Sequence, residues 1–240
     1  MSEAIFVQGL TKAYGGKMVV DHLDLSVKRG TVFGLLGANG AGKSTAIECM
    51  LGTNQADTGM VRLLGKNPKK HRRELFQHIG VQFQEGNYHP EIKVSELCVE
   101  TASLYRKSAD WRTLCKQFGL GDKANAAVKG LSGGERQRLF IVLALLPKPE
   151  LVFLDELTTG LDAKAWRGVW KTLESLKEQG LTIFLTSHFM DEVEALCDEI
   201  CVLKKGTPVF RGTVEQAKAL CRCERFEDAY LRLSDEEVDA

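Results

Sequence analysis

The segment 37–45, "GANGAGKST", has the residue types and the spacing of a phosphate-binding loop. It fits the pattern G-x-x-x-x-G-K-[ST], and it lies between an apolar run and a helical pattern. Glycines let successive backbone N–H groups turn toward phosphate oxygens, and the following helix adds the positive end of its dipole. We expect Lys43 to reach the β- and γ-phosphates of a nucleotide and Ser44 to offer its hydroxyl to Mg²⁺. The alternative is a plain glycine-rich turn.

Two adjacent carboxylates, Asp155 and Glu156, follow the apolar run 151–154, "LVFL". A buried strand rarely ends in uncompensated charge, because desolvating a carboxylate is costly unless a cation or hydrogen bonds meet it. We therefore expect Asp155 to hold Mg²⁺. By strand alternation Glu156 points the other way, where it is free to polarise an attacking water. The alternative is that these carboxylates cap the segment that follows.

The segment 131–146, "LSGGERQRLFIVLALL", reads as a helix with a weak start. Gly133 and Gly134 each cost about 1 kcal/mol relative to Ala inside a helix. Ser132 and Glu135 form the S-x-x-E capping box, which accounts for a helix start without any further function. The double glycine is not explained by the cap, but it would let a large anion approach the N–H groups at the positive helix end. Since 37–45 already serves one nucleotide, we interpret this helix end as closing over the nucleotide of a second copy.

The surrounding sequence predicts an α/β fold. Apolar runs rich in β-branched and aromatic residues lie at 31–36, 79–84, 151–154 and 182–186. Helical patterns lie at 43–51, 93–105, 134–146 and 163–179. This alternation predicts a parallel sheet covered by helices on both faces.

Three other regions differ from this alternation. The stretches 4–14, 22–27 and 60–65 alternate apolar and polar residues, which predicts an antiparallel sheet with one wetter face. The region 88–147 contains mostly helical pattern and reads as a helical insertion. The stretch 201–212 predicts a β-hairpin that turns at Lys205-Gly206.

Composition narrows the class of protein. The 240 residues are 44% apolar and 27% charged, with 32 basic and 32 acidic side chains, so no affinity for nucleic acid phosphates is expected. The longest apolar run, 139–146, is far shorter than the roughly 20 residues of a membrane-spanning helix. The first residues lack the pattern of a signal peptide, so we expect a cytosolic chain. The 7 cysteines show neither a zinc nor a disulfide pattern, and reduced thiols are expected.

With these motifs, above all "LSGGERQ" at 131–137, the chain resembles the ATP-binding subunit of ABC transporters from about Ile5 to Leu233. The resemblance implies a P-loop NTPase fold with a RecA-like, mostly parallel core sheet and an N-terminal antiparallel β subdomain. It places the core at about 1–87 and 148–240, a helical signature subdomain at about 88–147, and a frayed acidic tail at about 234–240.

The resemblance also implies roles for single residues. Tyr14 would stack on adenine, Gln84 would sense Mg²⁺ beside the contact with the membrane subunit, Asp162 would lie in a loop touching the opposite protomer, and His188 would contact the γ-phosphate. The implied ATP-binding residues are Tyr14, Gly37, Ala38, Asn39, Gly40, Ala41, Gly42, Lys43, Ser44, Thr45 and Gln84. The implied signature residues, which would bind the ATP of the partner, are Leu131, Ser132, Gly133, Gly134 and Glu135. The implied catalytic residues are Lys43, Glu156 and His188, and the implied Mg²⁺ ligands are Ser44, Gln84 and Asp155.

The sequence departs from the family pattern at two positions. Leu157 and Ala163 stand where the family commonly has proline. Both positions shape loops and bind no ligand, so we expect only a slightly looser loop geometry there.

By this resemblance two chains pair head to tail, as a homodimer or pseudo-dimer, with each ATP between one chain's Lys43 loop and the other's Ser132 helix. The chain would lie on the inner face of the membrane through an integral membrane subunit. The segments "IGVQFQEGNYHPEIKVSEL" and "FEDAYLRL" look like those of bacterial exporters of drugs, antibiotics or peptides.

Other functions remain open at this point. A soluble ABC-type ATPase of DNA repair, chromosome organisation or translation typically has a long coiled coil between the two nucleotide motifs, or two cassettes in one chain. Between Lys43 and Ser132 there is room for one small helical subdomain only. A P-loop kinase or GTPase would leave "LSGGERQ" unexplained. The basic run 66–73, "KNPKKHRR", reads as a solvated helix face, with lipid headgroups or nucleic acid as the alternatives.

Overall fold

The computed structural model describes residues 3–82, 88–89, 91–156 and 163–234, with the backbone only at 163–165. The chain forms two compact units, Met1–Leu75 with Phe184–Ala240, and Phe76–Ile183. Among the described residues no helix combines the length and apolar character that crossing a bilayer requires. The subdomain boundaries expected from the sequence stay a prediction.

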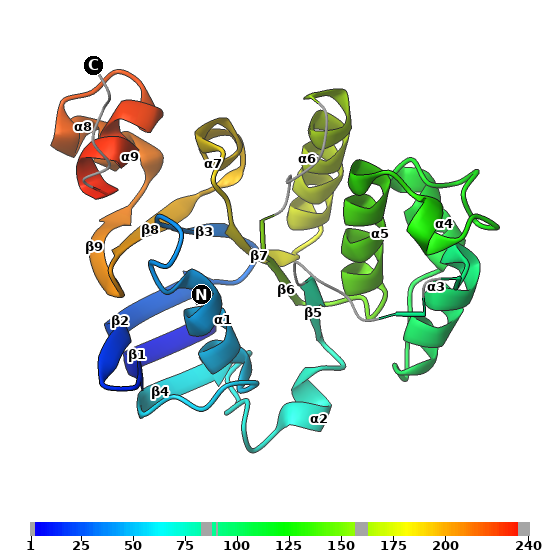
Figure 1. Ribbon diagram of the computed structural model, residues 1–240, viewed down its shortest axis with the longest axis horizontal. Helices are drawn as coiled ribbons and strands as arrows, with labels where there is room; N and C mark the ends of the chain where they lie inside the picture. Colours follow the sequence, from blue (N-terminus) through cyan, green and yellow to red (C-terminus); the bar gives the residue numbers. More distant parts are fainter. Residues whose placement is uncertain (1–2, 83–87, 90, 157–162, 235–240) are drawn as a thin grey trace. The chain divides into compact units, whose positions relative to one another are not determined.

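The first unit contains an antiparallel sheet of β1 (Glu3–Tyr14), β2 (Lys17–Lys28) and β4 (Thr58–Leu63), in the order β2-β1-β4 (Figure 1). Its apolar side chains alternate with polar ones, which confirms the sheet predicted for the N-terminal third. β1 and β2 are joined by Gly15 and Gly16, whose φ angles of 55° and 80° are those of a tight hairpin turn.

The buried core of this unit lies around a second set of strands. β3 (Val32–Leu36) is buried throughout and pairs in parallel with β8 (Glu199–Lys204), which pairs antiparallel with β9 (Thr207–Gly212). Lys205 and Gly206, with φ of 48° and 86°, form the hairpin turn that the sequence predicted. β7 (Thr182–Thr186), also buried throughout, enters this unit at Phe184, whose ring stacks on Phe33 with centroids 5.6 Å apart.

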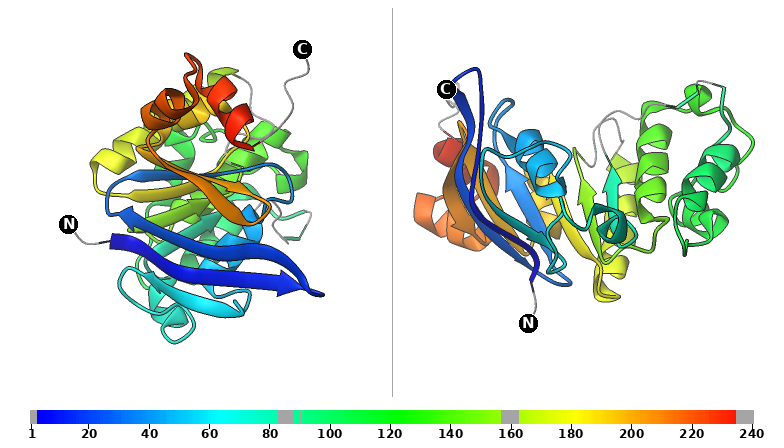
Figure 2. Two further views of the ribbon diagram at one scale, coloured as in Figure 1. Left: turned by 90° about the vertical axis from the view of Figure 1, so that its left-hand side faces the viewer. Right: turned by 90° about the horizontal axis from the view of Figure 1, so that it is seen from below.

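Helices complete the first unit. α1 (Lys43–Leu51) follows β3, and the short α2 (Arg72–Leu75) follows β4. α7 (Met190–Leu196), α8 (Val214–Cys221) and α9 (Phe226–Ser234) pack on β8 (Figure 2). The buried side chains that join these three helices to the strands are Leu36, Val193, Ile200, Val202, Val214, Ala217, Phe226, Ala229 and Tyr230.

The second unit combines a parallel strand pair with helices. β5 (Ile79–Gln82) pairs with β6 (Leu151–Leu154), and both strands begin and run as the sequence predicted, within the described residues. α3 (Val94–Ser103), α4 (Trp111–Gln117), a 3-10 turn (Val128–Gly130) and α5 (Gly133–Leu145) lie side by side, and α6 (Ala163–Glu178) follows (Figures 1 and 2).

At Gly80, α5 packs against β5 with no side chain between the two backbones. A Cβ added to Gly80 of β5 would lie 1.9 Å from the carbonyl oxygen of Ala144 in α5. Only glycine permits this approach, and the helix is therefore fixed on the strand by backbone contact. All 7 cysteines lie among the described residues, and none of them forms a disulfide there.

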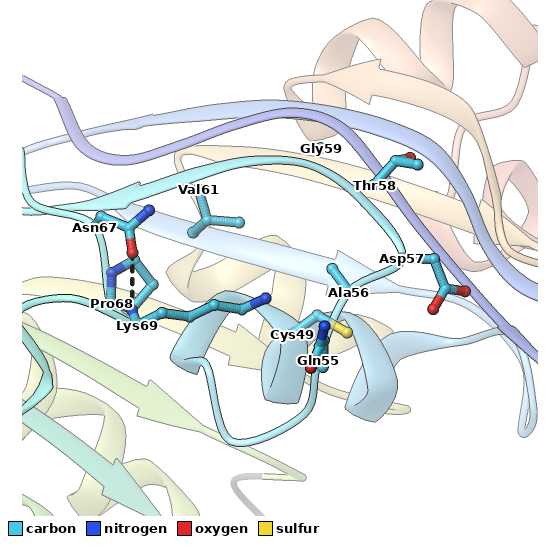
Figure 3. Close-up of a pocket in the computed structure, with 10 residues that line it drawn as sticks. All are labelled: Cys49, Gln55, Ala56, Asp57, Thr58, Gly59, Val61, Asn67, Pro68 and Lys69. Atoms are coloured by element: carbon cyan, nitrogen blue, oxygen red, sulfur yellow. Dashed lines mark hydrogen bonds between the residues drawn. The ribbon is translucent and has the colours of Figure 1, made fainter.

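A hollow of about 270 Å³ lies beside β4 in the first unit (Figure 3). It is lined by Cys49 of α1, by residues 55–57, by residues of β4, and by the turn 67–69, in which Asn67 Oδ1 accepts the Lys69 N–H at 2.9 Å. Of the residues that the sequence assigned to ATP binding, those that the structure describes do not line this hollow.

The two hairpin turns of the first unit allow a matched test of close backbone packing. A Cβ at Gly206 would lie 2.5 Å from the carbonyl oxygen of Val19, whereas a Cβ at Gly16 would meet nothing within 4 Å. Both residues have positive φ, so both substitutions carry the left-handed strain, and only one adds a clash. We expect Gly16→Ala to lower the free energy of unfolding by about 1 kcal/mol and Gly206→Ala by at least about 2 kcal/mol more. Urea denaturation measures both, and equal losses would contradict this packing.

Candidate functional site

The loop 37–42 leaves the buried strand β3 and enters α1 through three left-handed glycines. The φ angles are 149° at Gly37, 77° at Gly40 and 100° at Gly42, which is the N-cap of α1. Residues with a side chain rarely adopt such angles. The loop therefore has the backbone that a ring of inward-turned N–H groups requires.

The same loop is held from outside by neighbouring backbone. A Cβ at Gly42 would lie 2.2 Å from the Val19 oxygen of β2, and a Cβ at Gly37 would lie 2.5 Å from the Leu203 oxygen of β8. The Gly206 N–H donates to the Ala41 carbonyl at 3.0 Å. A Cβ at Gly40, in contrast, would meet nothing within 4 Å. The loop is packed at Gly37 and Gly42 and open at Gly40.

Lys43 lies over this loop and is only 7% exposed. Its ammonium donates to the carbonyls of Gly37 at 2.6 Å and Ala38 at 3.1 Å. These two acceptors are uncharged, and a phosphate oxygen would be a stronger partner for the same donor. Ser44 is exposed in the first turn of α1, and Thr45 is half-buried beside it.

Tyr14 is the last residue of β1 and is 47% exposed. Asn54 donates to its hydroxyl, and the Lys12 ammonium lies 5.0 Å from the ring centroid. Lys12 is itself held by Asp57 at 3.3 Å. The Ala13 N–H and Lys12 together lower the pKa of the Asp57 carboxyl, so the anchor stays ionised.

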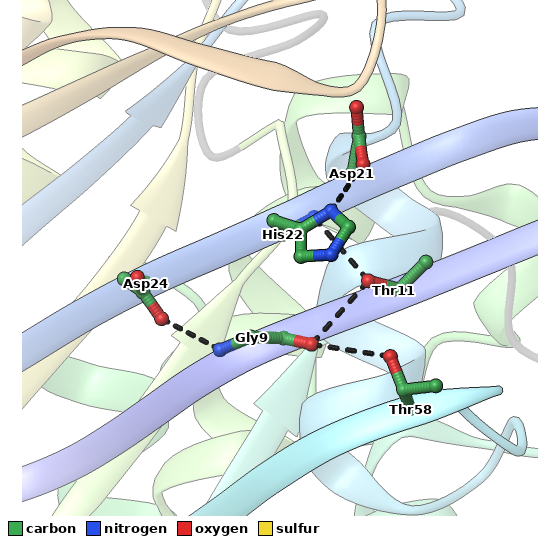
Figure 4. Close-up of polar contacts among 6 residues, drawn as sticks. All are labelled: Gly9, Thr11, Asp21, His22, Asp24 and Thr58. Atoms are coloured by element: carbon green, nitrogen blue, oxygen red, sulfur yellow. Dashed lines mark hydrogen bonds and ion pairs between the residues drawn. The ribbon is translucent and has the colours of Figure 1, made fainter.

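A polar cluster shapes β1 ahead of Tyr14 (Figure 4). The register with β2 shifts between Val7 and Leu10, where Gly9 has φ of 59°. The Gly9 N–H donates to Asp24 at 2.6 Å, and the Thr11 hydroxyl donates to the Gly9 carbonyl at 3.3 Å. The backbone groups that the bulge removes from the ladder are thereby satisfied.

The two carboxylates stand where β6 ends. Asp155 is 9% exposed, and its N–H donates to the Gln82 carbonyl at 3.3 Å, which prolongs the pairing of β5 and β6 by one residue. Glu156 is half-buried and has φ of 52°. Its orientation is set by this left-handed turn out of the strand, and the expectation that strand alternation directs it is wrong.

The N-terminus of α5 carries the predicted capping box. The Ser132 hydroxyl accepts the Glu135 N–H at 3.2 Å, and the Glu135 carboxylate accepts the Ser132 N–H at 2.9 Å. Leu131 is buried, whereas Ser132 and Gly133 are exposed. A Cβ at Gly133 would meet nothing within 4 Å, and its φ is not positive. Neither packing nor backbone conformation within the described chain requires glycine at 133.

Glu135 is held ionised at this helix end. The Ser132 N–H, and then the Lys123 ammonium at 2.9 Å, lower the pKa of its carboxyl to about 2. The negative charge lies in the first turn of α5, where it is favourable to the helix dipole.

His188 is exposed two residues after β7. The turn that carries it is fixed by two buried residues that the sequence reading missed. The Ser187 hydroxyl donates to the Glu192 carboxylate and accepts the Phe189 N–H at 3.0 Å. The available signal was an acidic residue on the inner face of α7, since fully buried glutamates are rare unless paired.

Three further residues singled out from the sequence, Gln84, Leu157 and Asp162, lie outside the described residues, and Ala163 is the first residue of α6. The 37–45 loop, Tyr14 and His188 belong to the first unit, while Asp155, Glu156 and 131–135 belong to the second. Within the second unit, the Gln137 side chain joins α5 to the carbonyl of Glu156 at 3.0 Å.

Known proteins match this chain along most of its length. A family model described as ABC transporter matches residues 20–159. The chain is 40% identical over 214 residues to the Nod factor export ATP-binding protein I of Ralstonia nicotianae, covering 86% of this chain and 66% of that protein. It spans about two thirds of the length of the curated relatives it matches.

Solved structures share the fold. An ATP binding subunit of an ABC transporter matches with a TM-score of 0.88 and 24% identity, over 96% of this chain and 99% of that chain. A dimeric bacterial ABC transporter cassette matches with a TM-score of 0.78 and 24% identity, over 87% of this chain and 98% of that chain. This likeness confirms the predicted α/β P-loop NTPase fold with its N-terminal antiparallel sheet and helices.

The ionised cap of α5 predicts a pH-dependent stability. Glu135→Gln keeps an oxygen for the Ser132 N–H but removes the charge, and we expect it to cost about 1 kcal/mol of unfolding free energy at pH 7. Because the pKa of Glu135 is lowered in the folded state, the contribution is complete above the unfolded pKa of about 4.3 and is lost as pH falls toward about 2. Urea denaturation of both proteins at pH 7, 5 and 3 measures it. A gap that stays constant down to pH 3 would disprove the charge effect.

Proposed function

Because this chain belongs to the ABC transporter family and is one of its ATP-binding ATPase cassettes, we propose that it powers export through a separate membrane subunit. Two copies pair head to tail around two ATP molecules. The observation that carries this proposal is a pair of backbone segments suited to bind an anion. One is the loop of left-handed glycines before α1, and the other is the α5 start, where the local structure does not require glycine at position 133. The relatives named as export ATP-binding proteins support the direction of transport.

One chain would bind ATP mainly through its loop. The N–H groups of 37–45 would surround the β- and γ-phosphates, and Lys43 would exchange its loop carbonyls for phosphate oxygens. Tyr14 would stack on adenine, because its ring is exposed at a strand end and is fixed by Asn54 and Lys12.

The second chain would complete the site with its signature segment, 131–135. The exposed Ser132 and Gly133 begin α5, and the absence of a Cβ at 133 leaves room for a phosphate at the helix N-terminus. Closure would then depend on ATP, because the γ-phosphate supplies the negative charge that both helix ends attract. Asp162 would lie in the loop that touches the opposite copy.

The donor set is suited to Mg²⁺. The Asp155 carboxylate is nearly buried at a strand end, and Ser44 presents a hydroxyl in the first turn of α1. Oxygen donors of this kind are the ligands that Mg²⁺ prefers. Ser44, Asp155 and Gln84 would hold the ion, which when bound neutralises charge on the phosphates.

Hydrolysis would open the dimer again. The Glu156 carboxylate would align and polarise the attacking water, and His188 would steady the γ-phosphate from a turn that Ser187 and Glu192 fix. Once the γ-phosphate leaves, the charge between the two surfaces is gone. The membrane subunit, with which the cassette would associate on the inner face of the membrane, would convert this cycle into movement of a cargo that it alone selects.

A soluble ABC-type ATPase is the second candidate, and the observations favour it less. The described helices between Lys43 and Ser132 have at most 10 residues, which leaves no coiled coil among them. The named relatives are export proteins.

Glu156→Gln tests the proposed role of the carboxylate. The amide keeps the shape but is no base, so we expect ATP binding to persist and hydrolysis to fall at least about 100-fold. Light scattering should show a stable dimer with ATP, and membrane vesicles that contain the membrane subunit should show no export. Glu150→Gln removes an exposed carboxylate of the same unit and should leave all three readouts unchanged. Hydrolysis by Glu156→Gln at the wild-type rate would overturn the proposal.

Gly133→Ala separates fold from function at the α5 start. The added methyl has open space and Ala is the better helix former, so stability should rise by up to about 1 kcal/mol. The same methyl would obstruct the partner's phosphate, and the ATP-dependent dimer of the Glu156→Gln protein should be lost on adding Gly133→Ala. Gly168→Ala in α6, where a Cβ also has open space, is the control that gains stability and keeps the dimer. A dimer that persists with alanine at 133 would remove the reason given for this glycine.

A further inference from the structure

Gln137 joins the start of α5 to the turn that carries Glu156. Its side-chain amide donates to the Glu156 carbonyl oxygen, with Nε2 and O 3.0 Å apart, and both residues are half-buried in the second unit. The bond spans 19 positions of sequence and connects a helix to the end of β6.

The Gln137 amide bonds to the backbone at a residue with an unfavourable conformation. The ladder of β5 and β6 ends with the bond from the Asp155 N–H to Gln82 at 3.3 Å. One residue later Glu156 turns left-handed, with φ of 52°, a conformation that a residue with a side chain keeps only when its surroundings impose it. The Gln137 amide holds the carbonyl of that residue.

The helix that presents Gln137 is itself fixed. The contact of Gly80 with the Ala144 carbonyl sets α5 on β5, the strand that pairs with β6. Arg138, the next residue, donates to the Phe118 carbonyl at 3.1 Å and anchors α5 beside α4. Gln137 therefore extends from a rigid support toward the end of the neighbouring strand.

We propose that Gln137 is a positioning residue for ATP hydrolysis: by holding the Glu156 peptide in its left-handed turn, it sets the direction of the Glu156 carboxylate. This inference rests on the proposed function, in which that carboxylate aligns the attacking water. Catalytic geometry is sensitive to small displacements, because a shift of about 1 Å at the reacting groups lowers rates severely.

The placement of Gln137 also links the two nucleotides of a dimer. Gly133, at the helix end proposed to receive the partner's ATP, lies four residues before Gln137, or about 6 Å along the helix axis. In the proposed dimer, the partner's phosphate would therefore contact the same fixed helix that positions the Glu156 peptide.

The test removes the donor and keeps the shape. Gln137→Met has similar length and helix propensity but no N–H, so kcat for ATP hydrolysis should fall about 10-fold while KM for ATP stays within about 2-fold. Gln77→Met is the matched control, because it removes a half-buried glutamine of the same unit whose amide donates to the Leu104 carbonyl at 3.3 Å and not to Glu156, and it should leave kcat within about 2-fold. Thermal unfolding of both variants checks that they are folded.

A double mutant separates positioning from mere structure. If Gln137 acts through the Glu156 carboxylate, adding Gln137→Met to Glu156→Gln should change the residual hydrolysis by less than about 2-fold. A further 10-fold loss in that background would show that Gln137 acts elsewhere and would overturn the inference. Wild-type kcat in Gln137→Met beside an inactive Glu156→Gln would overturn this inference alone, whereas an active Glu156→Gln would overturn the proposed function.

Gln137→Glu gives a second variant of the same shape. Its carboxylate has no donor at high pH, but the protonated form regains an O–H. The ratio of its kcat to that of the wild type should rise as pH falls from 8 to 6, since burial raises the pKa of such a carboxyl. A ratio that does not change with pH and lies near one would contradict the need for a donor.

Discussion

The backbone of the 37–42 loop touches the backbones of β2 and β8 with no side chain between them, and the site depends on this contact. Gly42 faces the Val19 carbonyl and Gly37 faces the Leu203 carbonyl at distances that exclude a Cβ. Because neighbouring backbone packs against the loop from outside, the loop conformation is fixed before any phosphate would bind. A preorganised set of donors loses little free energy to reorganisation when charge binds.

In the second unit, a glycine also allows two backbones to pack in direct contact. Gly80 lets α5 lie on β5 in backbone contact, so the helix and the end of β6 belong to one rigid piece. The capping box then fixes the α5 start, and the Gln137 amide fixes the turn at Glu156. The 37–42 loop thus follows the buried strand β3, the two carboxylates follow the buried strand β6, and in each unit a glycine admits a neighbouring backbone.

The parts of the site that the sequence predicted are those with local signals. The glycine spacing of 37–45, the S-x-x-E of the α5 start and the Lys205-Gly206 turn each specify their structure within a few residues. The left-handed turn at Glu156 and its bond to Gln137 depend on residues that only the fold brings together. No local sequence pattern therefore predicts them. Short helices such as α7 and α8 were missed because one or two turns show too little periodicity, and their stability comes from packing.

The use of serine as the N-cap of α5 has a consequence for the ATPase cycle. A serine hydroxyl can accept one hydrogen bond and donate another at the same time, whereas an aspartate, an equally good cap, can only accept. The Ser132 oxygen accepts the Glu135 N–H, and its own hydrogen can still point outward to an anion. In the proposed dimer the helix can therefore stay capped both with and without a bound phosphate. Binding or releasing the phosphate then does not require the first helical turn to unwind. An aspartate there would repel the very group that the helix end attracts.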